Sequence, residues 1–303
     1  MNVGKFSNVE IKFLPSKELK SSIGKMVHLG EASAISARQY SIYDATTVNS
    51  MNVKLNTDSN VCSIRGSCIV DDTVLFTDYN NKKLKRFDIK SSSLVDYCKL
   101  PDPQDVCKVE ENEVAVTCKN AVQFVSTRNM LSLSRSIKTQ HKSYGIAHND
   151  DKLYITDEGK SLYIYDMSGN LLKTVTTDLN DQSLFGRCNH IAFNAKNGRL
   201  FVGDDLKGLV CLNADGDYID TILDPSGKPS DVVVDGYGNV IISSSDLKSI
   251  LQCNSDGLIR GTIVNATKRK PQSLCIHQRR RKLFVGNHNS NTVEVFDLTW
   301  KNY

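Results

Sequence analysis

Three histidines and one carboxylate are the first candidates for metal chemistry, at His148, His190, His277 and Asp231. His190 begins a short apolar run, whereas His148 and His277 lie near the ends of theirs. A β strand rises about 3.3 Å per residue, so five or six residues along such runs separate the imidazoles by more than about 15 Å. The three histidines therefore do not share one metal, and we expect each to be a solvated or hydrogen-bonded turn residue.

Three further carboxylates, Asp78, Asp157 and Asp204, each follow an apolar run of similar composition. A carboxylate that recurs at the end of a strand usually accepts hydrogen bonds from the backbone of the next loop, so we expect a turn function rather than acid–base chemistry. The sequence also contains no G-x-S-x-G, G-x-x-x-x-G-K or H-E-x-x-H pattern. It predicts no catalytic residue, no cofactor and no enzymatic activity.

The nine cysteines are odd in number and include no C-x-x-C pair, which excludes both a disulfide framework and a zinc cluster of ordinary spacing. Most lie in apolar runs, so we expect buried, reduced thiols in a cytoplasmic protein. No apolar run approaches the ~18 residues of a membrane helix. Lys5, Glu10 and Lys12 interrupt the region where a signal peptide would be apolar, so we expect no membrane association.

The composition is that of a packed globular chain: 303 residues, of which 40% are hydrophobic and 24% charged. Basic residues number 38 and acidic residues 34, for a net charge of +4. So small an excess predicts no general attraction to nucleic acid, and any such attraction depends on where the cations lie.

An internal repeat of about 40 residues organises the chain. Its anchor is an apolar block followed by a small or polar residue: VLFTD, VAVTC, LYITD, LFVGD, VIISS and LFVGN, ending at Asp78, Cys118, Asp157, Asp204, Ser244 and Asn287. One apolar run precedes each anchor and two follow it. Four short strands per repeat, separated by turn residues, are typical of a propeller blade. Residues 66–298 therefore predict an all-β, six-bladed β-propeller.

The sixth blade lacks a fourth strand of its own, because too few residues follow Leu298. Met51, Val53 and Leu55 alternate with polar residues, which predicts a half-buried strand over residues 51–57. We expect this strand to complete blade six and close the ring, within a propeller spanning residues 46–303. Residues 1–45 form a separate segment, for which we predict a strand and a short helix from Ser16 to near Gly24.

The third repeat, SYGIAHNDDKLYITDEGKSLYIYDMSGNLLKTV, resembles the NHL repeat, and the fifth and sixth repeats fit the same pattern. The resemblance implies a propeller of the NHL or six-bladed TolB-like type. Trp300 is the only tryptophan, which disfavours WD repeats. The segment IKFLPSKELKSSIGKMVHLGEASA is similar to the linker between coiled coil and propeller in tripartite-motif (TRIM-NHL) proteins, so residues 1–45 are interpreted as that linker.

TRIM-NHL proteins usually carry a RING finger, a B-box and a coiled coil before the propeller, and act as ubiquitin ligases or RNA regulators. This chain has no Cys/His cluster with the spacing of a RING or B-box. Ubiquitin ligase activity would therefore require a RING outside this chain.

The arrangement of cations suggests a binding face. When the inner strands are aligned on Ile69, Val106, Ile146, Ile191, Val232 and Leu274, the position four residues earlier holds Arg65, Asp102, Lys142, Arg187, Lys228 and Lys270. The loops between second and third strands should share that face, and they hold Lys82, Lys83, Lys119, Lys160, Lys207 and Lys248. Tyr79 and Tyr144 would add stacking surfaces. The run Arg279–Arg281 should lie on the opposite face.

These patterns predict a non-catalytic recognition module whose cationic face binds a protein partner, by resemblance the substrate of a TRIM-type ubiquitin ligase. A first alternative is binding of single-stranded RNA by the same face. A second is a propeller lactonase or lyase, which would need several convergent ligands that the sequence lacks. A third is that the lysines are simply solvated loop residues. The identity of the partner and the oligomeric state are not encoded in these patterns.

Overall fold

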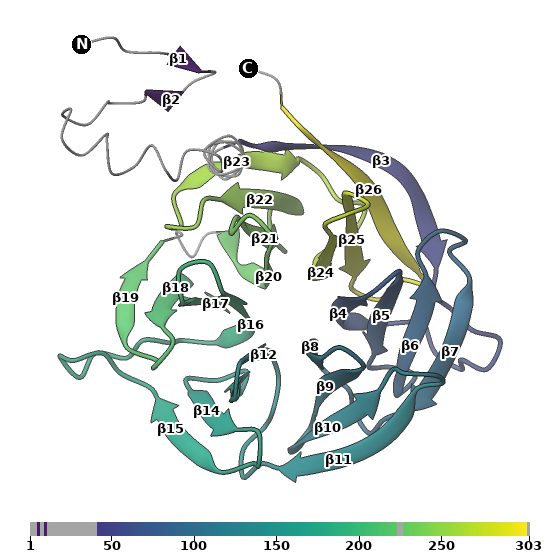
Figure 1. The fold of residues 1–303 in the computed structure, drawn as a ribbon, viewed down its shortest axis with the longest axis horizontal. Helices are drawn as coiled ribbons and strands as arrows, with labels where there is room; N and C mark the ends of the chain where they lie inside the picture. The colour runs from purple at the N-terminus through teal and green to yellow at the C-terminus, as the bar shows by residue number, and fades with distance from the viewer. Residues whose placement is uncertain (1–4, 7–8, 11–40, 223–226, 302–303) are drawn as a thin grey trace, which may run out of the picture.

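Six four-stranded antiparallel sheets surround a central channel, as the blades of a β-propeller (Figure 1). The computed structural model describes residues 5–6, 9–10, 41–222 and 227–301. Each blade begins with its inner strand beside the channel and continues outward, so the predicted all-β, six-bladed fold is confirmed.

The first three blades follow one another along the chain. Blade one holds β4 (Ile64–Val70), β5 (Thr73–Asp78), β6 (Lys83–Asp88) and β7 (Leu94–Lys99). Blade two holds β8 (Val106–Glu110), β9 (Glu113–Cys118), β10 (Ala121–Ser126) and β11 (Ser132–Lys138). Blade three holds β12 (Ile146–Asn149), β13 (Lys152–Thr156), β14 (Leu162–Asp166) and β15 (Leu171–Val175).

The last three blades complete the ring. Blade four holds β16 (Cys188–Asn194), β17 (Arg199–Asp204), β18 (Gly208–Asn213) and β19 (Tyr218–Thr221). Blade five holds β20 (Pro229–Val234), β21 (Val240–Ser244), β22 (Ser249–Cys253) and β23 (Ile259–Val264). Blade six holds β24 (Pro271–His277), β25 (Lys282–Asn287), β26 (Thr292–Trp300) and β3 (Tyr43–Asn52).

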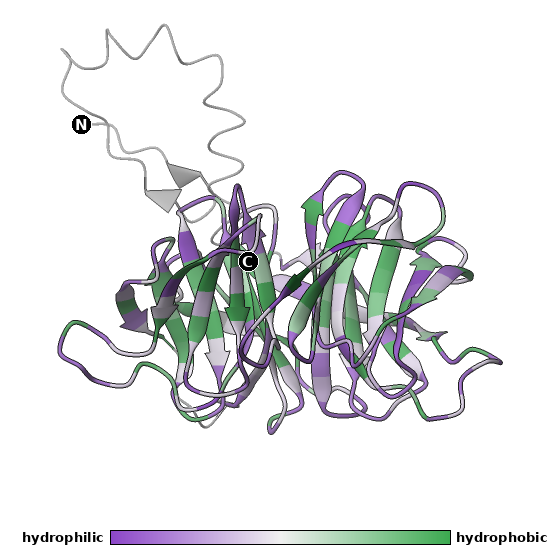
Figure 2. Ribbon diagram, turned by 90° about the horizontal axis from the view of Figure 1, so that it is seen from below, coloured by the Kyte–Doolittle hydropathy of each residue, from purple (hydrophilic) through white to green (hydrophobic). Residues whose placement is uncertain are grey.

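The core lies between neighbouring blades, where second strands contribute runs of fully buried side chains such as Val74, Leu75 and Phe76. Figure 2 shows the same pattern, with hydrophobic strand centres and hydrophilic turns at both ends of the sheets. In one cluster, Leu75 of blade one packs with Val106 of blade two. Burial of apolar surface therefore joins the blades to one another as well as stabilising each sheet.

Ring closure joins chain segments that lie far apart in sequence: β3 pairs antiparallel with β26, and Met51 lies opposite Val293. The closing strand was predicted at residues 51–57 but lies earlier in the chain. β3 spans Tyr43–Asn52, so only its last two residues overlap the prediction. Most side chains of this outer strand are exposed, so it carries little apolar alternation. Val53 is buried, but beyond the end of the strand.

The segment before the propeller is described only at β1 (Lys5–Phe6) and β2 (Val9–Glu10), which pair antiparallel. The helix predicted from Ser16 to Gly24 lies outside the described residues. Among the residues that the structure describes, no helix is long and apolar enough to cross a membrane. All nine cysteines are free thiols, and six of them are buried.

Removing residues 1–52 should destabilise the whole propeller, because β26 would lose its neighbour and Met51 would leave its apolar cluster. We expect the melting temperature to fall by about 10 °C or more. A second truncation, lacking residues 1–27, retains β3 and should melt with the full chain. Equal melting temperatures for the two truncations would contradict closure by β3.

Candidate functional site

The inner strands build the candidate site at one mouth of the channel, and their register shows which residues are equivalent. The residue two positions before the end of each anchor block pairs with one residue of the inner strand. In blades two to six these pairs are Val116 with Val106, Ile155 with Ile146, Val202 with Ile191, Ile242 with Val232 and Val285 with Leu274. The matching residue of blade one, Phe76, pairs with Ser67. The alignment on Ile69 was therefore wrong by two residues. The position four residues earlier holds Ser63, and Arg65 lies two residues further along β4.

Arg65 occupies a bulge. Ile64 pairs with Asp78 and Gly66 with Thr77, so Arg65 is the extra residue on its strand. The register shifts at the corresponding point in blades four, five and six as well. A bulge redirects the side chain of the extra residue, and such bulges are common beside binding sites. The residue after Arg65 is Gly66, and a side chain does not fit there, because a Cβ would lie 2.3 Å from Asp105 Oδ1 of the next blade.

The residues equivalent to Arg65 are all polar: Gln104, Tyr144, Asn189, Ser230 and Gln272. With Arg65, we call these six residues the mouth ring. They line two adjoining cavities, of about 310 and 270 Å³, and both cavities touch Arg65 and Tyr144. The mouth ring therefore forms a polar hollow at the entrance of the channel.

His190 forms the floor of this hollow, one residue further along its strand than Asn189. Its Nδ1 lies 3.2 Å from Asp105 Oδ2 and 3.4 Å from Asp231 Oδ1. Each carboxylate also accepts a backbone N–H of the following blade, Asp105 from Ile146 at 3.0 Å and Asp231 from Leu274 at 2.5 Å. The expectation of a solvated or turn histidine was wrong for His190, which is 3% exposed.

Neighbouring charges determine the protonation of His190 and Asp231 in this floor. Burial alone would lower the pKa of His190, but the carboxylates of Asp231 and Asp105 outweigh it and raise that pKa to about 9. Burial raises the pKa of Asp231 to about 7 against the attraction of His190. At neutral pH, His190 is thus an imidazolium held between two carboxyl groups of opposite blades.

The other two histidines fit the turn interpretation. His148 places Nε2 2.8 Å from the carbonyl of Asp150. His277 accepts the backbone N–H of Arg280 through Nδ1 at 3.1 Å. They lie at or next to the last residues of β12 and β24, whereas His190 lies near the start of β16, so the three do not converge.

Four of the outer cations at the mouth pair with carboxylates. Arg187 lies 3.0 Å from Glu158 and 3.7 Å from Asp205, and Lys228 lies 2.7 Å from Asp246. The two remaining pairs are Lys270 with Asp246 at 3.7 Å and Lys82 with Asp102 at 3.5 Å. Among the cations predicted for this face, five exposed lysines make no ion pair within the described part of the chain: Lys119, Lys142, Lys160, Lys207 and Lys248.

The two tyrosines are less available than expected. The Arg65 guanidinium covers the ring of Tyr79, 3.6 Å from its centroid. Tyr144 meets the ring of His190 edge-on, with centroids 5.5 Å apart. Lys83 does not belong to the exposed set, because it is buried in an ion pair with Asp58 at 2.6 Å.

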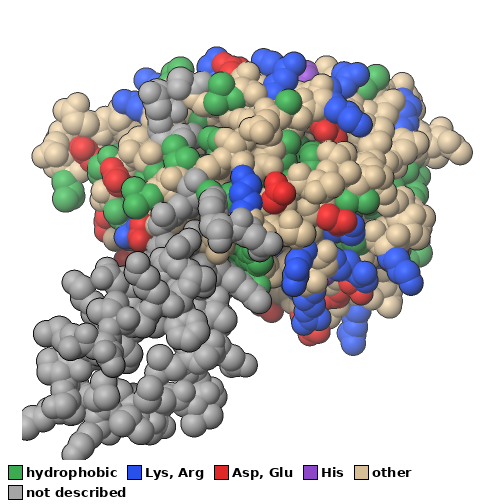
Figure 3. Space-filling view, turned by 90° about the horizontal axis from the view of Figure 1, so that it is seen from above, with side chains coloured by type: hydrophobic (Ala, Val, Ile, Leu, Met, Phe, Trp, Pro, Cys, Tyr) green, Lys and Arg blue, Asp and Glu red, His purple; other side chains and the backbone are tan. Residues whose placement is uncertain are grey.

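Cations are not confined to the mouth. Seen edge-on, Lys and Arg side chains project from both rims of the ring, with Asp and Glu among them (Figure 3). On the opposite side, Arg279 and Arg281 are exposed beside the turn after β24. Arg280 between them pairs with Asp72 at 2.9 Å.

The repeated carboxylates act as turn devices, as predicted for Asp157 and Asp204. Asp157 accepts the backbone N–H of Gly159 at 2.7 Å, and Asp204 accepts those of Leu206 and Lys207 at 2.8 Å. Asp78 accepts the backbone N–H of Ser63 at 3.0 Å but also binds Lys85 Nζ at 2.6 Å, which the turn interpretation did not include.

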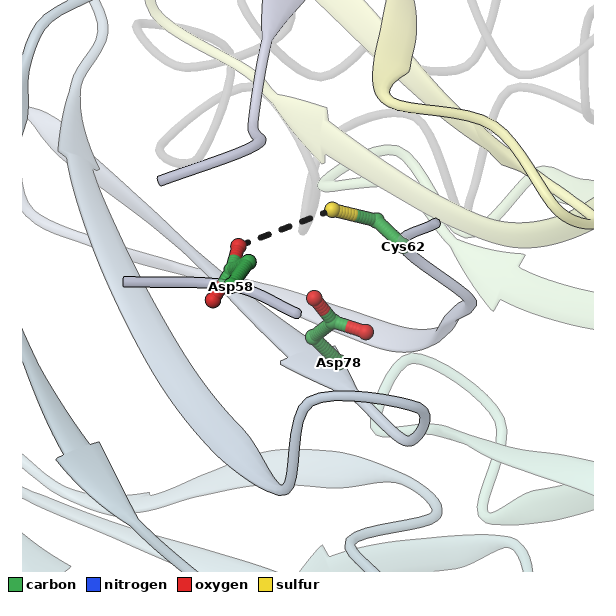
Figure 4. Close-up of side chains that lie close together, drawn as sticks. All are labelled: Asp58, Cys62 and Asp78. Atoms are coloured by element: carbon green, nitrogen blue, oxygen red, sulfur yellow. Dashed lines mark hydrogen bonds between the residues drawn. The ribbon is translucent and has the colours of Figure 1, made fainter. Parts of the chain in front are cut away.

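Asp58, Cys62 and Asp78 lie close together with the spacing of metal ligands (Figure 4). Lys85 Nζ already contacts this group, 2.6 Å from both Asp58 and Asp78 and 3.5 Å from Cys62 Sγ. It also donates to the carbonyl of Val53 at 2.9 Å. The buried ammonium thus occupies the position that a metal ion would take, and it joins the segment after β3 to blade one.

Comparison with known proteins supports the fold. No family model matches the chain, and no curated protein matches its sequence. A structural genomics protein of unknown function from Bacteroides thetaiotaomicron is similar, with TM-score 0.69 and 12% identity over 85% of this chain and 76% of that one. Glutaminyl cyclase of Myxococcus xanthus gives TM-score 0.52 and 10% identity over 86% of this chain and 98% of that one.

The raised pKa of His190 should make stability fall with rising pH. Its contribution is complete below the ordinary pKa of about 6.5 and is lost as pH rises through about 9. Between about pH 7.5 and 10, chemical denaturation should show a larger loss for the wild type than for His190→Gln. Parallel losses, together with an NMR titration midpoint of His190 at or below about 6.5, would contradict the assignment.

Replacing Lys85 by Met should cost about 3–5 kcal/mol of unfolding free energy, because buried Asp78 loses its cation and buried Asp58 keeps only Lys83. Urea denaturation would measure it, with the exposed Lys90→Met as a control expected within about 0.5 kcal/mol of wild type. Zinc or EDTA should leave the wild-type melting temperature unchanged. A rise with zinc would mean that a metal displaces the Lys85 ammonium.

Proposed function

We propose that this protein is a non-catalytic recognition module that binds a protein partner through the face around the channel mouth. The observation that carries the proposal is the mixed charge of that face. Lysines without ion pairs surround a polar hollow whose rim alternates cations with Asp102, Glu158, Asp205 and Asp246. A protein surface with charges of both signs complements such a rim.

The same observations disfavour RNA as the ligand. Phosphates would gain from the lysines but would be repelled by four carboxylates interleaved with them. Sequence-tolerant RNA binding also needs exposed aromatic faces. Arg65 already covers Tyr79, and Tyr144 packs against His190.

The resemblance of the repeats to the NHL repeat supports a finer version of the proposal. In TRIM-NHL proteins the propeller accompanies ubiquitin ligase machinery, so the partner here would be a ubiquitination substrate and the RING would lie outside this chain. The floor of the mouth supports a role without catalysis. His190, Asp105 and Asp231 already bind one another or the backbone.

Two matched variants test the proposal, each reversing three exposed cations that make no ion pair within the described residues. One replaces Lys119, Lys142 and Lys160 by Glu at the mouth. The other replaces Lys90, Arg279 and Arg281 by Glu near the turns on the opposite side. Proximity labelling with quantitative proteomics should show at least tenfold loss of the wild-type partners for the mouth variant only. Equal loss in both variants, or loss in neither, would overturn the proposal.

An RNA-binding measurement tests the main alternative, in which the ligand is RNA. Fluorescence anisotropy with a short oligouridylate should give no binding at physiological salt. Binding that the mouth variant alone loses, with a salt slope of about −0.7 per phosphate contact, would replace the protein partner by RNA.

A further inference from the structure

We infer that Arg65 anchors a carboxylate of the protein partner, which enters the channel mouth between Arg65 and the hydroxyl of Tyr144. The inference rests on the proposed function and names the chemistry that the mouth would recognise. Arg65 is the one ionised side chain among the six equivalent residues of the mouth ring. Its side chain lines both cavities of the hollow.

Arg65 differs from the other arginine of the mouth in lacking an acidic partner. Arg187 pairs with Glu158 and Asp205, whereas no carboxylate in the described residues forms an ion pair with Arg65. The only hydrogen bond of the Arg65 guanidinium within the described chain is donated by Nη1 to Gln104 Oε1, and its Nε is buried without an acceptor. Nη2 makes no hydrogen bond within the described chain, so it and the second proton of Nη1 are the donors left for a bound anion.

The guanidinium is already positioned for binding. It stacks on Tyr79, 3.6 Å from the ring centroid, and the bond to Gln104 fixes its orientation. A planar guanidinium held in this way binds carboxylates through two parallel hydrogen bonds, with little loss of side-chain entropy.

Tyr144 supplies a second donor. It lines the same two cavities, and its hydroxyl makes no hydrogen bond within the described chain. Burial raises the pKa of Tyr144 to about 12, so the hydroxyl keeps its proton at neutral pH. A carboxylate oxygen bound to Arg65 can therefore accept from this hydroxyl as well.

The surroundings favour one negative charge rather than two. Asp205 lines the first cavity, and Asp102 and Glu158 line the second. Below them, His190 is shared by Asp105 and Asp231, so the floor carries a net negative charge when both are ionised. A doubly charged phosphate would meet this repulsion without a second unpaired arginine, whereas one carboxylate matches one guanidinium.

Selection from displayed random peptides of about a dozen residues tests the inference, with internal and free C-terminal libraries run separately. Peptides enriched by the wild type should share one Asp or Glu, or a free C-terminus. Replacing that side chain by Asn or Gln, or amidating the terminus, should weaken binding roughly tenfold to hundredfold. This change leaves the protein intact, so a folding defect cannot imitate it.

Protein variants complete the test. Arg65→Gln should weaken binding of the acidic peptide by a similar factor and hardly change binding of its neutral analogue. The affinity of Arg65→Lys for the acidic peptide should fall between those of the wild type and Arg65→Gln. Arg279→Gln, on the opposite face, should bind like wild type. Enriched peptides without a shared carboxylate, or equal affinities for Arg65→Gln and Arg279→Gln, would overturn the anchor but leave the recognition function. Failure of the wild type to enrich any peptide would overturn both.

Discussion

Closure of the ring by β3 and β26 is the constraint on which the rest of the structure depends. Blades contact one another mainly through buried apolar faces, so a gap in the ring would expose an edge and let neighbouring inner strands move apart. Lys85 reinforces the closure, because its ammonium binds Val53 just beyond β3 as well as Asp58 and Asp78. A closed ring is needed for residues of six blades to meet at one channel mouth.

The mouth obtains its chemistry from one position repeated around the ring. In blades one, four, five and six a bulge near the start of the inner strand places the mouth-ring residue, and the residue after the ring position contributes His190, Asp105 or Asp231 to the floor. Side chains at these positions can vary without disturbing the apolar contacts between blades. Exposed ion pairs on the rim contribute little free energy individually. Specificity therefore rests on the partly buried groups inside the rim.

Much of the fold was predictable because apolar anchors recur at regular spacing and blade packing requires them. The closing strand was misplaced because β3 is mostly exposed and lacks apolar alternation. Arg65 was assigned to the wrong ring because blade one has the polar Ser67 where the other inner strands have an apolar residue, so the alignment on apolar residues selected Ile69. Asp105 was missed, although aligning all repeats at the position of His190 and Asp231 would have revealed it. Lys85 carried no signal, since only the folded chain brings Asp58 to it.

The central claim is that the polar mouth of the closed ring is the recognition surface. Hydrogen exchange with and without a bound partner peptide would test it most directly. The account predicts new protection at residues 63–66, 142–145 and 187–190, where the mouth ring and its outer cations lie. Protection confined to the turn at 277–282, on the opposite side of the ring, would contradict it.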